Sequence, residues 1–339
     1  MMKKWIRKQM DDQSKTMPIL SFPAVWLLDI NVRQLVNSSY YQAMAMQEIS
    51  KNFPTSAALS MMDLSVEAEA FGSSIRFFDM DVPTVSASLI KNQKEAKDLT
   101  VPKVGLKRDG IYIEGIRKAS REIYDRPVFA GVIGPFSLAG RLMDMTEIMV
   151  NCYENPDMVH IILEKASEYI TDYIIEFKKA GAGGVIMAEP AAGLLSPDLC
   201  QKYSSHYVKE IFSKVNDKDF ILIYHNCGNV VPLISSIIDI DADAYHFGNC
   251  IDIYEMLKII PKDKLVMGNI DPTLFTGENT EAITKVTTEL LERCSSFPNF
   301  SISSGCDIPP ASNWNNLKAY FDAIQSFSKE IFNKKIQSG

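Results

Sequence analysis

The sequence predicts an α/β protein built as a (β/α)₈ TIM barrel, forming a single domain with an N-terminal helical extension. Two observations support this fold class: eight short apolar runs recur along the 339 residues, and longer helical patterns separate them. A chain of this length also suits a large barrel that folds as one unit. Because no linker, repeat or low-complexity tract interrupts the pattern, we expect one domain over residues 1–339.

The order of the elements follows from these runs. A short charged helix over residues 3–12 forms the extension, and an irregular excursion is expected over residues 75–112. The predicted strands cover residues 23–27, 57–63, 128–135, 184–189, 220–227, 244–248, 265–270 and 300–306. The predicted helices cover residues 32–51, 66–72, 158–180, 196–215, a segment that begins at residue 280, and residues 316–334.

Composition narrows the functional class. A hydrophobic content of 46% can fill a large core, and a net charge of −7 disfavours non-specific binding to nucleic acid. The six cysteines have no regular spacing, so they do not form a disulfide framework. No run approaches the roughly 18 apolar residues of a membrane span, and the basic N-terminus lacks the apolar segment of a signal peptide. We therefore expect a cytoplasmic protein, without a nucleic-acid or membrane partner, whose thiols stay reduced.

A metal site is predicted at the end of the strand over residues 220–227. His225 and Cys227 are two positions apart, so on an extended chain both side chains point to the same side. Cys306, 79 residues after Cys227, ends the last predicted strand. Imidazole and thiolate are good zinc ligands, and a Cys₂His set leaves one coordination position open, as in catalytic zinc sites.

Other polar residues follow predicted strand ends, where barrel enzymes carry their chemistry. Asp63, Asn249 and Asp271 are predicted to bind substrate, although Asp271 could instead cap the next helix. Glu189 is predicted to be a displaceable fourth zinc ligand; water, or a capping or salt-bridged role for Glu189, is the alternative. His246 lies on a strand near the same end, from which it could reach the site, but a lone histidine there is more often a core residue than a ligand.

Three segments carry a family resemblance. Residues 66–72 (VEAEAFG), 268–272 (GNIDP) and 304–310 (SGCDIPP) resemble the uroporphyrinogen decarboxylase superfamily, and the resemblance spans about residues 19 to 327. The His-x-Cys pair with a distant Cys is similar to the pattern of the methylcobamide:coenzyme M methyltransferases within it. That resemblance implies that His225, Cys227 and Cys306 bind Zn²⁺. The metal would activate a small thiol, coenzyme M in that family, to take a methyl group from the methylcobamide of a corrinoid-binding partner protein. Homocysteine or another thiol acceptor stays open for this chain.

Two alternatives stay open. One is decarboxylation of a tetrapyrrole, for which the decarboxylase branch carries an Arg-Gln-Ala-Gly-Arg stretch. Here residues 29–33 read DINVR, which leaves only Arg33 to balance the carboxylates of a porphyrinogen. The other alternative is a non-catalytic partner of a corrinoid protein. We expect the methyltransferase, because its His-x-Cys and distant Cys pattern is present and the basic stretch of the decarboxylases is not. Two protein thiolates would cancel the zinc charge, and a third, from the substrate, would stay electron-rich enough to attack carbon.

Overall fold

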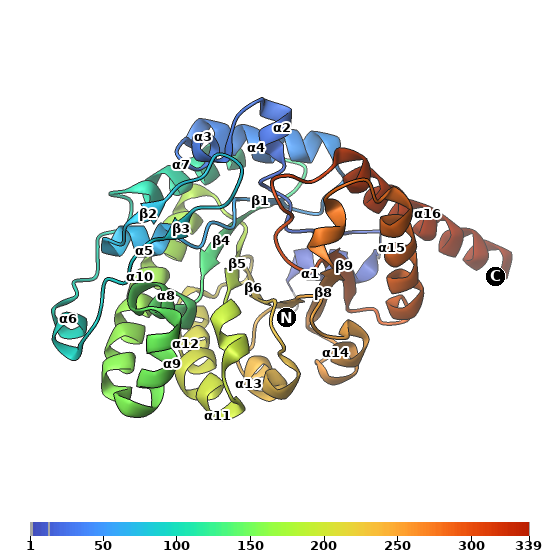
Figure 1. Cartoon of the computed structure of the whole chain (residues 1–339). Helices are drawn as coiled ribbons and strands as arrows, with labels where there is room; N and C mark the ends of the chain where they lie inside the picture. Colours follow the sequence, from blue (N-terminus) through green and yellow to red (C-terminus); the bar gives the residue numbers. More distant parts are fainter. Residues whose placement is uncertain (1–2, 13, 339) are drawn as a thin grey trace.

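The computed structural model describes residues 3–12 and 14–338, and its centre is one curled parallel sheet (Figure 1). Seven strands lie side by side in chain order, and each neighbouring pair is parallel. Their bounds are β1 (Ala58–Leu59), β4 (Val128–Ile133), β5 (Gly184–Ala188), β6 (Ile221–Asn226), β7 (Ala244–Phe247), β8 (Leu265–Ile270) and β9 (Phe300–Ser304). This arrangement confirms the predicted barrel class.

The first predicted strand, over residues 23–27, is wrong. These residues form the short helix α2 (Ala24–Leu28). Pro23 precedes it with φ −57° and ψ −18°, already helical, and Asp29 ends it in the left-handed region at φ 50°. An apolar run of five residues has no periodicity that distinguishes a buried strand from a helical turn.

The eighth position of the barrel is filled by the segment that precedes α2. Thr16 forms a parallel bridge with Thr55 on the side of β1, and its carbonyl accepts from the Ser56 amide at 2.8 Å. On the side of β9, the Thr16 hydroxyl donates to the Ile302 carbonyl at 2.6 Å, and the Ile19 amide donates to Ser304 Oγ at 2.9 Å. Residues 16–19 therefore close the gap between the first and last strands of the sheet.

Along β5, β6 and β8, successive apolar side chains alternate between an inner and an outer layer. Ile221 and Ile223 of β6 point into the barrel, whereas Leu222 and Tyr224 pack against the surrounding helices. The predicted N-terminal helix is confirmed as α1 (Lys4–Asp11), and its Ile6 belongs to the inner layer. Trp5 packs edge-on against Phe129, with ring centroids 5.0 Å apart. The extension thus plugs the barrel end opposite the carboxyl ends of the strands.

Helices cover the outside of the sheet (Figure 1). The predicted excursion over residues 75–112 contains a small antiparallel pair, β2 (Ile75–Arg76) and β3 (Thr84–Val85). It also contains the helix α6 (Gln93–Asp98) and the start of α7 (Arg108–Glu122). Gly72 ends α5 at φ 114°, as its predicted stop position requires. Among the residues described, no helix combines the length and apolar character needed to cross a bilayer.

The remaining elements are α3 (Val32–Val36), α4 (Ser39–Asn52), α5 (Val66–Phe71), β2 (Ile75–Arg76), β3 (Thr84–Val85), α6 (Gln93–Asp98), α7 (Arg108–Glu122), α8 (Pro135–Met143), α9 (Met145–Glu154), α10 (Pro156–Ala180), η1 (Pro190–Leu194), α11 (Pro197–Cys200), η2 (Gln201–Ser205), α12 (His206–Val215), η3 (Val231–Leu233), α13 (Ile234–Ile238), α14 (Ile253–Ile259), η4 (Pro272–Phe275), α15 (Thr280–Cys294) and α16 (Trp314–Ser338).

Candidate metal centre

The pleat of β6 directs His225 into the barrel. Ile221 and Ile223 lie in the inner layer, so the next residue of the same parity, His225, also faces inward at the carboxyl end of the strand. Asn226 faces outward and organises the turn that follows. Its Nδ2 donates to the Glu189 carbonyl at 2.6 Å, and its Oδ1 accepts from the Gly228 amide at 2.8 Å. This turn holds Cys227 beside His225.

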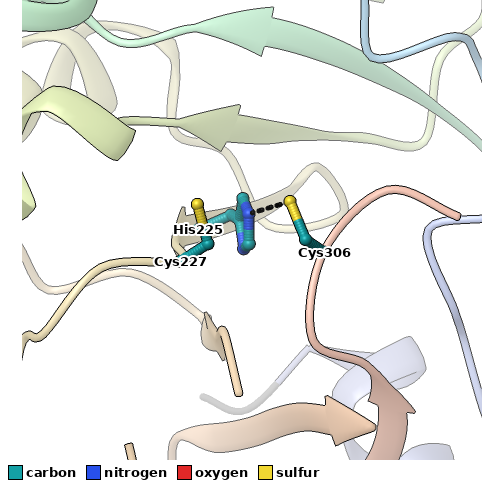
Figure 2. Close-up of side chains that lie close together, drawn as sticks. All are labelled: His225, Cys227 and Cys306. Atoms are coloured by element: carbon teal, nitrogen blue, oxygen red, sulfur yellow. Dashed lines mark hydrogen bonds between the residues drawn. The ribbon is translucent and has the colours of Figure 1, made fainter. Parts of the chain in front are cut away.

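Cys306 completes the group from the loop after β9 (Figure 2). Its Sγ lies 3.7 Å from His225 Nε2, and the ligand atoms of His225, Cys227 and Cys306 all lie within 4.8 Å of one another. A tetrahedral zinc with Zn–S of about 2.3 Å and Zn–N of about 2.05 Å separates its ligand atoms by about 3.6 to 3.8 Å. The donor set and its spacing therefore fit Zn²⁺ with only small side-chain adjustments.

The two thiols are electrostatically linked. A hydrogen bond from Cys306 lowers the pKa of Cys227, and the neighbouring His225 acts in the same direction. The pKa of Cys306 is raised, first by that same contact with Cys227 and then by burial. Without a cation, ionisation of one thiol therefore makes ionisation of the other less favourable. A divalent metal removes this conflict because it stabilises both thiolates at once.

Gly248 lets the loop of Cys227 pack closely against the end of β7. A Cβ at this position would lie 2.5 Å from Cys227 Cα and 2.7 Å from its carbonyl oxygen. Both contacts are with backbone atoms, so a side chain here would displace Cys227 from the group. A glycine directly after the strand over residues 244–247 is thus a requirement of the metal centre.

His246 contacts the candidate ligand His225, which is the less favoured of the two roles that its position in the sequence allowed. It is fully buried on β7, as expected of a core residue, but its Nδ1 lies 2.9 Å from His225 Nδ1. Burial lowers the pKa of His246 well below its usual value, and the neighbouring His225 adds to this effect. Strand parity could have revealed the contact, because His246 pairs with His225 in the sheet register.

The structure does not place Glu189 among the zinc ligands. Ala188 points inward, so the pleat turns Glu189 outward to the N-terminus of α8, where it accepts from the amides of Phe136 at 2.8 Å and Ser137 at 3.2 Å. Ser204 Oγ also donates to it, at 3.0 Å. Burial raises the pKa of Glu189 to about 7 against these donors. Its position relies on Gly134, where a Cβ would lie 1.9 Å from the carboxylate.

The three predicted substrate-binding residues have different environments. Asp63 is buried and saturated, since it pairs with Arg108 and accepts from Tyr112 Oη at 2.9 Å and Ser65 Oγ at 2.6 Å. Asp271 caps η4 by accepting from the Thr273 amide at 2.9 Å, which is the alternative that its position allowed. The Asp63 carboxylate is therefore fully engaged by its neighbours. Asp271 caps η4 through Oδ1 alone, and substrate binding by Asp271 stays a prediction.

Asn249 is exposed and close to the Cys306 loop. The backbone nitrogen of Asn249 lies 2.8 Å from the position that a Cβ on Gly305 would occupy. Gly305 directly precedes Cys306 in the chain, so Asn249 lies near the candidate metal centre and stays a candidate for substrate binding.

Two charged groups near the mouth were missed. Asp307 follows Cys306 directly, its Oδ1 is buried without a hydrogen-bond partner, and burial raises its pKa well above the usual value. Arg141 on α8 is half-buried and interacts electrostatically with Asp63, and within residues 3–12 and 14–338 we find no hydrogen bond or ion pair for it. Burial lowers the pKa of Arg141. The Cys-Asp neighbours were a usable signal for Asp307, whereas nothing in the sequence singled out Arg141.

Comparison with known families places the chain. Residues 31–327 match the family model described as uroporphyrinogen decarboxylase (URO-D). The chain belongs to the URO-D family. This match confirms the membership that the sequence predicted. Members of the URO-D family are enzymes.

Individual URO-D relatives are distant. The chain is 23% identical over 270 residues to the methylcobamide:CoM methyltransferase MtbA of Methanosarcina acetivorans, covering 78% of each protein. It is 25% identical over 296 residues to a uroporphyrinogen decarboxylase of Pseudomonas syringae, covering 82% of this chain and 80% of that protein.

Solved structures confirm the fold. A methyltransferase from Methanosarcina mazei superposes with a TM-score of 0.86 at 20% identity, over 95% of this chain and 96% of the other. A B12-independent methionine synthase from Shewanella sp. W3-18-1 gives a TM-score of 0.61 at 13% identity, over 91% of each chain.

Proposed function

We propose that this URO-D family member is a cytoplasmic zinc-dependent methyltransferase, which moves a methyl group from a methylated corrinoid protein to a small thiol. One observation supports this proposal above all others: two thiols and an imidazole converge at the mouth of the barrel with the spacing of a zinc site. The similarity to the methylcobamide:CoM methyltransferase of Methanosarcina acetivorans supports the same reaction class.

Each ligand has a role that follows from its chemistry. Zinc, when held there, supplies a Lewis acid that binds the substrate thiol as a thiolate. Cys227 and Cys306 together balance the metal charge, so the substrate sulfur remains electron-rich. His225 adds a neutral donor and leaves one position for that sulfur. In the proposed reaction the thiol would lose its proton to solvent on binding, its sulfur would attack the methyl carbon of the donor substrate, and the C–Co bond would break with its electron pair left on cobalt.

A decarboxylase activity has little support at this mouth. Arg33, the arginine left from the basic stretch of that branch, lies on the surface, where it donates to the Phe77 carbonyl at 3.2 Å and pairs with Asp79 at 3.7 Å. Arg108 is already neutralised by Asp63 and Glu69. The several carboxylates of a porphyrinogen would therefore meet few uncommitted cations here.

Arg141 supports a thiol with an acidic end. The half-buried Arg141 guanidinium has no hydrogen bond or ion pair among the described residues, and the acid that interacts with it electrostatically, Asp63, is already paired with Arg108. An anionic group of a ligand would therefore stabilise it. We propose that Arg141 pairs with the carboxylate or sulfonate of the thiol, and that Asn249 and Asp307 line the same space. Coenzyme M and homocysteine both carry an acidic group.

Metal analysis and a methyl-transfer assay test the proposal together. The purified chain should hold about one zinc, and with methylcob(III)alamin and 2-mercaptoethanesulfonate or homocysteine it should produce cob(I)alamin under anaerobic conditions. Cys306→Ser and His225→Ala should lose most of the zinc and the activity. Cys250→Ser is the matched control, because Cys250 is exposed and outside the group. Wild-type protein without zinc after supplementation would overturn the proposal, and zinc without transfer to any thiol would favour a non-catalytic corrinoid partner.

A further inference from the structure

A buried chain of polar groups runs from the candidate metal centre to the segment that closes the barrel. His225 Nδ1 lies 2.9 Å from His246 Nδ1, His246 Nε2 lies 2.8 Å from Ser303 Oγ, and Ser303 Oγ lies 2.8 Å from the Met17 carbonyl. His225, His246 and Ser303 are at most 2% exposed. Bulk solvent therefore does not compete for these contacts, and each hydrogen can be assigned from the groups that the structure brings together.

The direction of each hydrogen bond in this chain of groups follows from the Met17 carbonyl at one end and the His246 carbonyl near the other. The Met17 carbonyl can only accept, so the Ser303 hydroxyl donates its one hydrogen to it. Towards His246, Ser303 Oγ then only accepts, which puts the hydrogen of His246 on Nε2. A protonated His246 would face His225 with a second donor, so His246 is neutral and its Nδ1 accepts.

The same logic determines the tautomer of His225. Its Nδ1 lies 2.9 Å from the accepting Nδ1 of His246 and 3.2 Å from the His246 carbonyl, and a carbonyl only accepts. His225 Nδ1 therefore carries the hydrogen and donates to both. This leaves the lone pair on Nε2, the nitrogen that lies 3.7 Å from Cys306 Sγ.

We propose that His246, aligned by Ser303 and the Met17 carbonyl, is a positioning residue that fixes the tautomer and the ring orientation of His225 for metal binding through Nε2. This inference rests on the proposed zinc site. Ligand histidines are usually oriented by a carboxylate or a carbonyl. Here the side-chain partner is a neutral imidazole, which adds no negative charge beside two thiolates and a third from the substrate. The acceptor thus orients His225 without opposing thiolate binding.

Two substitutions of His246 distinguish its effect on the orientation of the His225 ring from its contribution to core packing. His246→Asn places a side-chain oxygen about where Nδ1 lies, so an acceptor for His225 is retained. His246→Leu fills similar space with no acceptor. We expect His246→Leu to lower zinc affinity by about 10- to 100-fold, measured by competition with a chromophoric chelator, and His246→Asn to keep most of the affinity. Thermal unfolding of both metal-free variants measures the packing loss, and His206→Asn, at an exposed position on α12, is the control.

Cobalt substitution adds a spectroscopic readout. The visible d–d bands of the Co²⁺ form should shift in His246→Leu and stay near those of wild type in His246→Asn. Equal loss of metal affinity in the two variants, in proportion to their loss of stability, would overturn the inference. So would a His246→Leu variant with wild-type affinity. Wild-type protein that binds no zinc would instead refute the proposed function.

Histidine nitrogen NMR tests the tautomers in the unaltered protein. The chain has four histidines, which makes selective ¹⁵N labelling practical. Zinc-loaded wild type should show the hydrogen of His225 on Nδ1 and that of His246 on Nε2. The opposite tautomer in either ring, or a doubly protonated His246, would overturn the inference even if no variant folds.

Discussion

Glu67 is a buried acid whose ionisation opposes folding. Its Oε1 accepts from the Ile133 amide at 3.0 Å, while its Oε2 is buried without a hydrogen-bond partner. Burial raises the pKa of Glu67 from 4.5 to about 7. Between these two values the unfolded chain has released its proton while the folded chain still holds it, so the free energy of unfolding falls as the pH rises from about 4.5 to about 7.

The substitution Glu67→Gln removes this penalty. At about 1.4 kcal/mol for each pH unit, the interval corresponds to about 3 kcal/mol. Gln resembles the neutral acid and keeps the acceptor for Ile133. We therefore expect wild type and variant to have similar stability at pH 5, and the variant to be more stable at pH 8 by up to about 3 kcal/mol.

Urea unfolding at pH 5 and pH 8 measures the difference. The protein should be metal-free in excess chelator, because zinc binding releases protons of its own. Glu122→Gln is the control, since Glu122 is exposed at the end of α7. A stability difference between Glu67→Gln and wild type that stays constant between the two pH values would refute the reasoning, as would one that grows towards acid.

Further outcomes follow from the site. Glu189→Gln should keep the zinc and its X-ray absorption spectrum; loss of the metal would restore Glu189 as a ligand. Gly248→Ala should lower zinc occupancy in metal analysis, because its Cβ would stand 2.5 Å from Cys227 Cα. Arg141→Gln should raise KM for an acidic thiol by about 10- to 100-fold and leave KM for 2-mercaptoethanol unchanged; an equal change for both thiols would remove Arg141 from substrate recognition. Calorimetry in buffers of different ionisation enthalpy should count about one proton released per thiol bound to the zinc form, and none would mean that the thiol does not ligate the metal.

The sequence predicted the candidate site best where a metal-binding residue type occupies an inward-facing position of a predicted strand. The inward parity of His225 and the matching context of Cys306 were enough to predict a group that the structure brings within 4.8 Å. The same parity, applied to residue 189, would have turned Glu189 away from the zinc site. The outward direction of Glu189 was therefore predictable from the sequence.

The closing segment of the barrel lay beyond sequence reasoning. Residues 16–19 include Pro18, which cannot donate to a ladder, and only Thr16 forms a strand-like bridge. Their position depends on side-chain hydrogen bonds to β9, with Ile302 lying 286 residues away. Neither periodicity nor propensity reports contacts of that range. The apolar run of α2 was therefore the more attractive candidate, and it was wrong.

This closure has a consequence for synthesis of the protein. Thr16 leaves the ribosome long before Ile302, and at about 5 to 20 residues per second the 286 residues between them take about 15 to 60 s to translate. During that time His225 and Cys227 can already be in place, whereas Cys306 and the Ser303 that aligns His246 do not yet exist. The complete ligand set, and the tautomer that suits it, can form only when translation is almost finished. His225, Cys227 and Cys306 can therefore come together only late, after the strand that closes the barrel has been made.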